Sequence, residues 1–358
     1  MMLVARQGNT MATFNLSRSA EARWQRLFAL AMRLDELCPW EWMGVADCFG
    51  LLFPEQKEPC FVVFGGSPKT FRHVRFLMGW KAFYDMITRL AAPSKQTPTW
   101  LLEIPMIEML FVEPASLFDH EREFYEALER PLKSGPDNVV FRSIIPGYHP
   151  WIPDDEELAL LETALYQAYG MAMRVESDGL LLKSEFPRKI LVRKQNEQGD
   201  WHDDWTTIKP IADEEVEVRL ANDLLQALRD KPLWPMTVQL DLVFTPLSIG
   251  DKGVRPQTAY VLLVVDAVSG MIIAEELFLA SDGIPLMWAA IPERLLAIFK
   301  RLGGCPETIE VGNDRMANLL RPLGELLPFK MVRRERLSVL ENAREKIDGF
   351  IKEAGAAP

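Results

Sequence analysis

The sequence contains no apolar run long enough to cross a membrane. Its longest apolar stretches, Tyr260 to Val265 and Met271 to Ala274, have the length of strands, whereas a membrane-spanning helix needs about 20 residues. Residues 1–18 are polar and show no sustained apolar segment of the kind found in secretory signals. We therefore expect a cytoplasmic protein without a membrane partner. We also expect residues 1–18 to form a loose tail, in which Met11 is an alternative start to Met1.

Cysteine is scarce and unpaired in its spacing. No C-x-x-C motif occurs among the four cysteines, Cys38, Cys48, Cys60 and Cys305. Isolated cysteines of this kind are usually buried as small hydrophobic side chains. A zinc site built from them together with His73 is the alternative, and the spacing gives it little support.

Histidine is equally scarce, with four residues and no H-x-x-x-H pattern, and the chain has no nucleophile elbow. Zinc-peptidase and serine-hydrolase chemistry therefore have no support. The segment DWHDDW places His202, Asp203 and Asp204 in a row. Because neighbouring strand residues point to opposite faces, these three side chains cannot all reach one ion. We expect no resident metal or cofactor from either pattern.

Positive charge is in deficit, since 40 lysines and arginines stand against 51 aspartates and glutamates and the net charge is −11. Nucleic-acid binding depends on Lys and Arg that neutralise phosphates, so most of this surface would repel nucleic acid. Two local stretches are basic, Arg188 to Lys194 and the group Lys330, Arg333, Arg334 and Arg336. They predict either a local nucleic-acid patch or solvated strand ends.

The composition is otherwise that of an ordinary globular protein, with 48% hydrophobic and 25% charged residues. A chain of 358 residues exceeds the length at which one hydrophobic core keeps growing, so two domains are expected. Composition and turn signals predict an N-terminal α/β domain over residues 19–170, a connecting region with a hairpin and a helix over 171–235, and a C-terminal domain over 236–353.

Apolar periodicity predicts the elements of the first part. Trp24, Leu27, Ala31 and Leu34 recur at helical spacing, and Pro39 ends that helix. Apolar runs bounded by turn residues predict strands, and acidic starts and glycine stops predict helix ends. The predicted strands cover 49–54, 60–66, 99–105, 106–112 and 138–145, with a hairpin over 188–208. The predicted helices cover 20–37, 71–90, 116–131, 153–170 and 221–229.

The C-terminal part has the predicted order β-β-β-α-β-α-β-α. Its strands are expected at 237–245, 260–266, 271–278, 308–311 and 329–332. The helices between and after them end at Leu302, cover 315–327, and begin at Glu335. The last helix places Leu337, Leu340 and Ile347 on one face, which predicts packing against a sheet.

This order resembles the ribonuclease H-like fold of integrases and transposases. The strands VQLDLVFTPL, YVLLVVDAVSG and MIIAEELF resemble the first three strands of those catalytic cores. The resemblance implies a first catalytic aspartate at Asp241, and in active members such carboxylates gather two divalent ions about 4 Å apart. The fold class expected for the whole chain is α/β (α+β), with a mixed N-terminal domain and a ribonuclease H-like C-terminal domain.

The second carboxylate of that motif is missing. At the end of the strand after the first helix the chain has Gly312 and Asn313, and Asp314 follows only afterwards. We interpret Asp314 as the cap of the next helix, with Asn313 as the competing cap. Glu341 and Glu345 in the last helix are candidates for the third carboxylate, or else solvated surface.

Two function hypotheses follow from the missing second carboxylate. The first is a non-enzymatic binding or interaction protein with a degenerate ribonuclease H-like domain. The alternative is a nuclease or nucleotidyl-transfer enzyme that uses Mg²⁺ or Mn²⁺ held by Asp241, Asp314 and Glu341 or Glu345. The partner is expected to be a protein or a nucleic acid.

The whole chain also resembles an uncharacterised bacterial family, a domain of unknown function, through the element PWEWM with a following FG and the element FR with a following PGYHPW. That resemblance implies an architecture and no activity. The two elements contain Trp40, Trp42, Tyr148 and Trp151 beside prolines. Such aromatics predict either a groove that binds bases or a proline-rich peptide, or packing within the domain.

Overall fold

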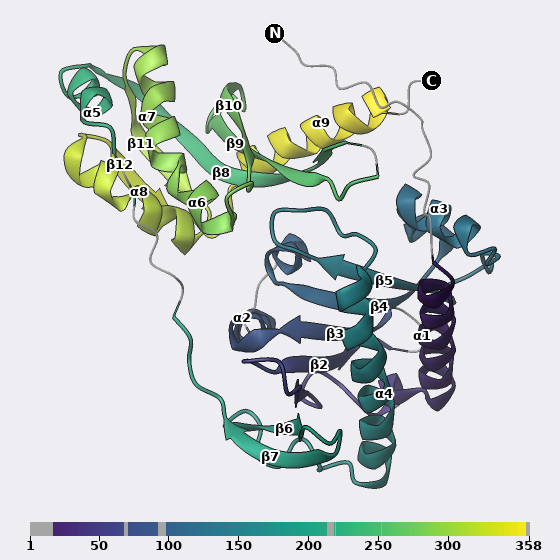
Figure 1. The fold of residues 1–358 in the computed structure, drawn as a ribbon. Coiled ribbons are helices and arrows are strands. Elements are labelled where there is room, and N and C mark those ends of the chain that lie inside the picture. Colours follow the sequence, from purple (N-terminus) through teal and green to yellow (C-terminus); the bar gives the residue numbers. More distant parts are fainter. Residues whose placement is uncertain are drawn as a thin grey trace. The chain divides into compact units, whose positions relative to one another are not determined.

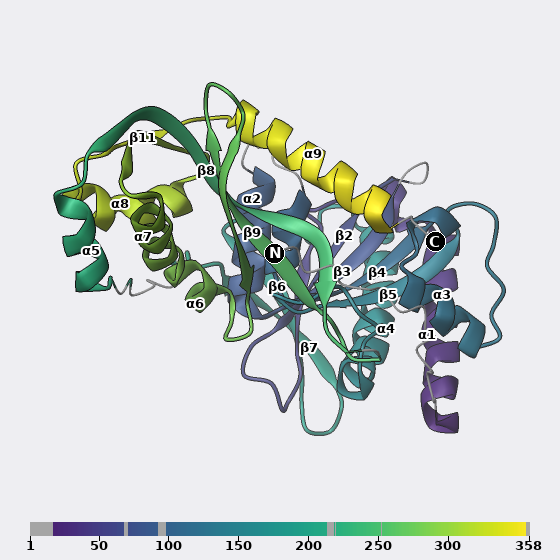
Figure 2. The ribbon, with the colours of Figure 1, turned by 90° about the horizontal axis from the view of Figure 1, so that it is seen from above.

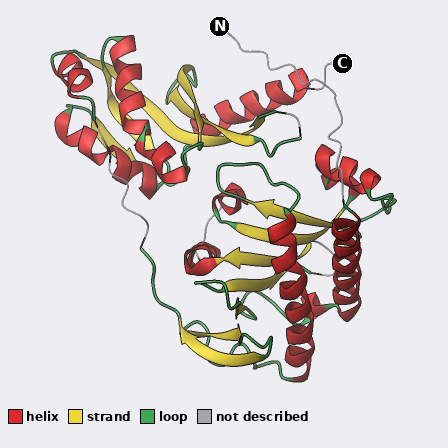
Figure 3. Ribbon diagram, in the orientation of Figure 1, coloured by secondary structure: helices red, strands yellow, loops and turns green. Residues whose placement is uncertain are grey.

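A computed structural model of the chain describes residues 17–67, 71–91, 98–212, 218, 220–251 and 253–355. These residues form two compact units. The N-terminal unit is built on a seven-stranded sheet and the C-terminal unit on a five-stranded sheet, and helices pack on both (Figure 1, Figure 3). The predicted α+β fold class is confirmed. Within the described part of the chain no helix is long and apolar enough to cross a membrane.

The N-terminal sheet has the strand order β5-β4-β3-β2-β1-β6-β7. Its neighbouring strands are antiparallel, except for the parallel pair β1 and β6. The hairpin predicted over residues 188–208, within the expected connecting region, therefore forms one edge of this sheet. The strands are β1 (Phe49–Leu52), β2 (Cys60–Gly65), β3 (Arg72–Met78), β4 (Met106–Val112), β5 (Asn138–Ile144), β6 (Lys189–Gln195) and β7 (Trp201–Thr207).

Side chains of each strand alternate between the two faces of this sheet. Both faces carry apolar side chains, and helices cover both. On one face α1 (Arg18–Leu37), α3 (Asp119–Ala127) and α4 (Asp155–Ser177) share a core that contains Trp24 and Val62. On the other face α2 (Gly79–Ala91) packs Phe83 against Phe61, with ring centroids 4.3 Å apart.

Three predicted elements of this unit are wrong in type or extent. The helix expected over 71–90 begins only at Gly79, because the residues before it form β3 between β2 and β4. The strand expected over 99–105 is a short 3₁₀ helix, η2 (Pro98–Glu103). Gly170, the expected end of a helix, lies inside α4. A helical glycine costs about 1 kcal/mol, which the burial of Met171 and Val175 beyond it offsets.

The C-terminal sheet has the order β10-β9-β8-β11-β12, antiparallel over the first three strands and parallel over the last three. The expected order of elements is found, with the helix before Leu302 divided in two. The strands are β8 (Leu233–Ile249), β9 (Gln257–Asp266), β10 (Ile272–Leu279), β11 (Cys305–Val311) and β12 (Lys330–Arg333). The helices are α5 (Asn222–Arg229), α6 (Ile284–Ala289), α7 (Ile291–Leu302), α8 (Asp314–Leu326) and α9 (Ser338–Gly355).

The two faces of this sheet have different covers. The helices α5 to α8 pack on the face that carries Leu240 and Leu262, and α9 packs on the face that carries Val243 and Leu263 (Figure 2). Alternation along β8 therefore turns Gln239 and Asp241 towards the α9 side. The candidate site lies on this side, where β8 runs beside the end of β11.

Candidate functional site

Asp241 stands on β8 directly beside the end of β11. Leu240 pairs with Val311, so the next residue of β8 faces Gly312. A Cβ atom on Gly312 would lie 3.3 Å from Oδ2 of Asp241 and 3.1 Å from Cδ1 of Leu337. The small residue at 312 thus leaves the space that the Asp241 carboxyl occupies.

Asn313 is the side chain that reaches Asp241. Its Nδ2 donates to Oδ1 of Asp241 at 3.0 Å, and the backbone N–H of Leu242 donates to the same oxygen at 2.9 Å. The Oδ1 atom of Asn313 accepts from the backbone N–H of Met316 at 2.7 Å, which makes Asn313 the N-cap of α8. One amide therefore links Asp241 to the start of α8.

The prediction that Asp314 caps α8 is wrong. Asp314 is the first residue of the helix, and its side chain is 85% exposed and forms an ion pair with Arg333 at 3.0 Å. Both residue types are good caps, and Asn313 takes the position because it has the extended backbone that an N-cap requires.

Burial raises the pKa of Asp241 to about 6, well above the usual value for an aspartate. The N–H groups of Leu242 and Asn313, and then the charges of Arg333 and Arg344, act against this rise and lower the pKa. Burial therefore disfavours the ionised form of Asp241 in the folded protein.

Two of the three carboxylates expected to join Asp241 have other partners. Asp314 is paired with Arg333, and Glu341 is paired with Arg336 at 2.6 Å. Glu345 is exposed on α9. No group of three His, Cys, Asp or Glu side chains able to hold a metal ion occurs in the described ranges. The residues present therefore do not fit the two-ion site that the nuclease hypothesis requires.

A second polar group lies one step along the same strands and was missed in the sequence. Nε2 of Gln239 donates to Oε2 of Glu310 at 3.0 Å, and Arg334 donates to Oε1 of Glu310 at 2.7 Å. Oε1 of Gln239 accepts from the backbone N–H groups of Val339 and Leu340 at 3.1 and 3.0 Å. This network joins β8 and β11 to the first turn of α9. Its only sequence signal is a polar residue at alternate positions in otherwise apolar strands.

The basic group at the end of β12 is matched by acids. Arg333 pairs with Asp314, Arg334 with Glu310 and Arg336 with Glu341. Lys330 is exposed at the start of β12. The three arginine pairs reduce the net positive charge of this surface, which weakens the case for a nucleic-acid patch.

The four aromatic residues singled out in the N-terminal unit have different environments. Trp40 is 4% exposed and packs edge-on against Phe111, with centroids 5.7 Å apart. Trp42 is half-buried against the same core, and Tyr148 and Trp151 are half-buried in the segment after β5. Trp40 is thus a core residue, as in the packing alternative.

Trp151 belongs to a stack of rings at the edge of the sheet. Its ring lies 4.1 Å from that of His120, which in turn stacks on Phe118 at 5.5 Å, and the guanidinium of Arg142 lies 4.4 Å from the Phe118 ring. Burial, followed by the charge of Arg142, lowers the pKa of His120 to about 4. A neutral imidazole therefore stands between two aromatic rings, which favours a packing role for Trp151.

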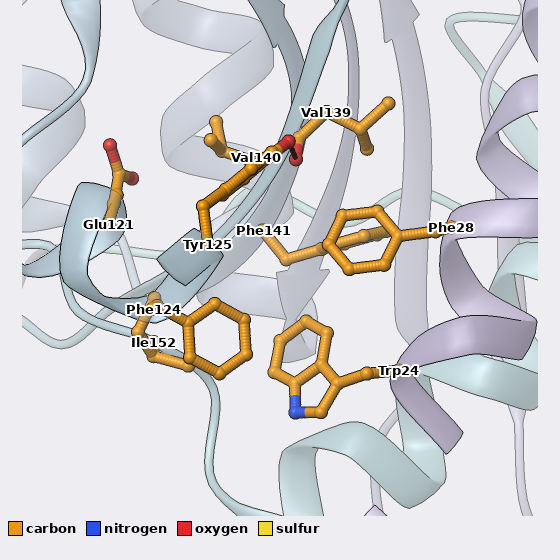
Figure 4. Close-up of a pocket in the computed structure, with 9 residues that line it drawn as sticks. All are labelled: Trp24, Phe28, Glu121, Phe124, Tyr125, Val139, Val140, Phe141 and Ile152. Carbon is orange, nitrogen blue, oxygen red and sulfur yellow. Dashed lines mark hydrogen bonds between the residues drawn. The ribbon is translucent and has the colours of Figure 1, made fainter. Parts of the chain in front are cut away.

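A narrow crevice in the N-terminal core is too small for a ligand. Its walls include Trp24 and Phe28 of α1, Phe124 of α3 and Phe141 of β5 (Figure 4). The enclosed volume is about 10 Å³, close to the minimum for one water molecule. The crevice is a packing defect between rings, with Trp24 and Phe124 at 4.8 Å.

Comparison with known families covers both units. Residues 24–193 match a family model described as a domain of unknown function (DUF7309). Residues 224–348 match a second one, also described as a domain of unknown function (DUF6930). No curated protein matches the chain. The chain therefore joins, in one polypeptide, two regions that are each similar to an uncharacterised domain family. The expected resemblance to domains of unknown function is confirmed to that extent.

Proposed function

We propose that this is a non-enzymatic binding protein whose C-terminal unit is a degenerate ribonuclease H-like domain. The strand order β10-β9-β8-β11-β12 supports the proposal, because three antiparallel strands followed by two parallel ones is the arrangement that the sequence resemblance implies. The position of α9 on the Asp241 side of the sheet agrees with the helix that carries the third carboxylate in active members.

The hydrogen bond between Asn313 and Asp241 carries this proposal. Metal ions such as Mg²⁺ require oxygen ligands that point at the ion. The oxygen of Asn313 caps α8, so its N–H is the group directed at Asp241. Turning the amide round would direct an oxygen at Asp241 and remove the cap, which is worth about 1 kcal/mol. Asn313 therefore replaces a ligand by a hydrogen-bond donor.

The alternative is a metal-dependent nuclease or nucleotidyl-transfer enzyme. The observation in its favour is the raised pKa of Asp241, because perturbed carboxyls cluster at functional sites. Against it stand the arginine partners of Asp314 and Glu341, which would have to be given up for either side chain to bind an ion.

Thermal melting with Mn²⁺, with Mg²⁺ and with a chelator separates the two hypotheses, since a ligand bound only by the folded state raises the midpoint. We expect the same midpoint under all three conditions for the parent. We expect Asn313→Asp, which restores a second carboxylate beside Asp241, to gain a rise with Mn²⁺. A rise in the parent that Asp241→Asn abolishes would overturn the proposal in favour of the metal enzyme.

A further inference from the structure

The helices α1 and α4 lie side by side on the N-terminal sheet and run in the same direction (Figure 1). Near their first turns Arg23 donates to the backbone oxygen of Asp155 at 3.2 Å. Further along both helices the guanidinium of Arg33 lies 4.7 Å from the centroid of the Tyr169 ring. The two helices therefore border one continuous seam on their outer side.

A shallow groove of about 500 Å³ follows this seam. On α1 its wall is a single stripe, because residues 26, 29, 30 and 33 recur at helical spacing. Its lining combines small and apolar side chains with charged ones, and we call Arg26 and Arg33 its rim. The residues that line the groove include Arg26, Ala29, Leu30, Arg33, Glu162 and Tyr166.

Apolar side chains continue on the outer side of α4. Tyr166 is 60% exposed and Met173 is 47% exposed, and Tyr169 lies between them on the same stripe. The inner side of α4 is also apolar, from Leu158 to Val175. A helix that is apolar on both sides is usually covered on both, and exposed apolar patches mark sites of interaction.

The groove is basic in a chain that is acidic overall. The charged residues of its lining are Arg26, Arg33 and Glu162. Glu162 pairs with both Arg23, at 3.5 Å, and Arg26. Two guanidinium groups against one carboxylate in the lining leave a local positive charge, although the net charge of the chain is −11. Charge complementarity then favours an acidic partner.

We propose that this groove binds an acidic amphipathic helix of a partner protein. Apolar residues of that helix at i, i+3 or i+4, and i+7 would contact Leu30 and Tyr166, and its Glu or Asp residues would face Arg26 and Arg33. The stretch from Glu162 to Met173 is roughly 16 Å long at 1.5 Å per residue, which accommodates three turns. The inference rests on the proposed binding function and names the surface and the class of partner.

A second copy of the chain is a poorer fit to the same surface. If two such grooves met face to face, the arginine rims would be brought together, and like charges across an interface are unfavourable. An acidic helix meets no such repulsion.

Fluorescence anisotropy with labelled peptides tests this proposal on the full chain. The probe is an amphipathic peptide of about 20 residues with Leu on one face and Glu and Ala on the other, and the control peptide has Lys in place of Glu. The double variant Arg26→Glu with Arg33→Glu reverses the rim. Because exposed ion pairs contribute little to folding stability, this variant is expected to fold. Ala29→Trp fills the groove without a change of charge.

We expect the Glu peptide to bind the parent and the Lys peptide not to bind it. The rim reversal should weaken the Glu peptide by at least about 10-fold, or about 1.4 kcal/mol, and should create binding of the Lys peptide. Ala29→Trp should weaken the Glu peptide as well. Arg188→Glu, whose side chain is 80% exposed outside the groove, is the matched control and should leave binding unchanged.

Equal binding of both peptides, no binding of the Glu peptide, or a Glu-peptide affinity unchanged by rim reversal would overturn the proposal. Sedimentation equilibrium that shows a dimer dissociated by Ala29→Trp would overturn it in favour of a second copy. These outcomes are independent of the melting experiment with metals. Metal binding at Asp241 would remove the proposed non-enzymatic function and leave the peptide result standing, whereas peptide failure alone would remove only this surface.

Discussion

At the scale of single residues, Asp241 has an environment that disfavours its charge. Two N–H donors and the fields of two arginines favour the carboxylate, but burial outweighs them and keeps the pKa at about 6. In the unfolded chain the same group has a pKa of about 3.9. As the pH rises between these values, the folded state keeps a proton that the unfolded state releases, and folding stability falls.

Asp241→Asn should therefore stabilise the protein above pH 6. The amide keeps the acceptor for Asn313 and has no charge to bury. The difference in pKa corresponds to about 3 kcal/mol at most, at 1.36 kcal/mol per unit. Urea unfolding at about pH 8 and about pH 4 should show a more stable variant at the higher pH, with the gain shrinking towards the lower pH.

Asp266 serves as the control, because its pKa is shifted in the opposite direction to that of Asp241. Hydrogen bonds from Val268 and Ser269 lower the pKa of Asp266, so its ionised form is favoured in the folded state. Asp266→Asn should bring no gain above pH 6. If Asp241→Asn and Asp266→Asn showed the same dependence on pH, the environment inferred for Asp241 would be wrong.

Only part of the candidate site could be predicted from the sequence. Asp241 and the missing second carboxylate could be found from the resemblance alone, because each is a matter of residue type at a strand position. The choice of Asn313 over Asp314 as cap could not, because both are good caps and only the backbone at the start of α8 distinguishes them. The arginines of the groove could not be predicted as a binding surface, because charged residues are usual on the outer side of a helix.

At the scale of elements, the position of α9 depends on a side chain of β8. Oε1 of Gln239 accepts two N–H groups of the first turn of α9, where the helix has no backbone partners of its own. Nε2 of Gln239 also donates to the buried Glu310. Three polar groups thus depend on one amide.

Gln239→Leu should destabilise the protein by about 2–4 kcal/mol, because it leaves those buried groups without their partner. Urea unfolding measures the loss, and amide hydrogen exchange should show faster exchange at Val339 and Leu340 than in the parent. Gln226→Leu, an exposed site on α5 of the same unit, should stay within about 0.5 kcal/mol. A Gln239→Leu variant as stable as the Gln226→Leu variant would contradict the role of this network.

Elements were predictable where periodicity and breakers agreed. The buried positions of α1 recur at helical spacing from Trp24 to Leu34, and Pro39 follows, so its bounds were found closely. The strand β3 was not predicted because His73 and Arg75 interrupt its apolar run. In the sheet both residues lie between neighbouring strands, and Arg75 pairs with Glu108 at 2.6 Å. Glu310 could not be predicted as the partner of Gln239, because the two residues meet only through the pairing of β8 with β11.

At the scale of the whole molecule, the sequence pattern and the sheet imply different ends for the N-terminal domain. The sequence placed the end at residue 170 and a connecting region after it. In the structure β6 pairs in parallel with β1, and Ile190, Leu191 and Val192 are buried in the cores on the two faces of the sheet. The hairpin β6–β7 therefore supplies part of the apolar burial that stabilises the sheet.

A fragment of residues 17–212 should consequently melt as a cooperative unit, and a fragment of residues 19–170 should not. The shorter fragment exposes the edge of β1, loses the buried hairpin and removes the end of α4, including Val175. An uncovered edge strand promotes aggregation. Circular dichroism melting and size-exclusion chromatography of the two fragments measure the difference. If the shorter fragment were monomeric and melted at the same midpoint as the longer one, β6 and β7 would be accessory to this sheet, and the end at residue 170 would stand.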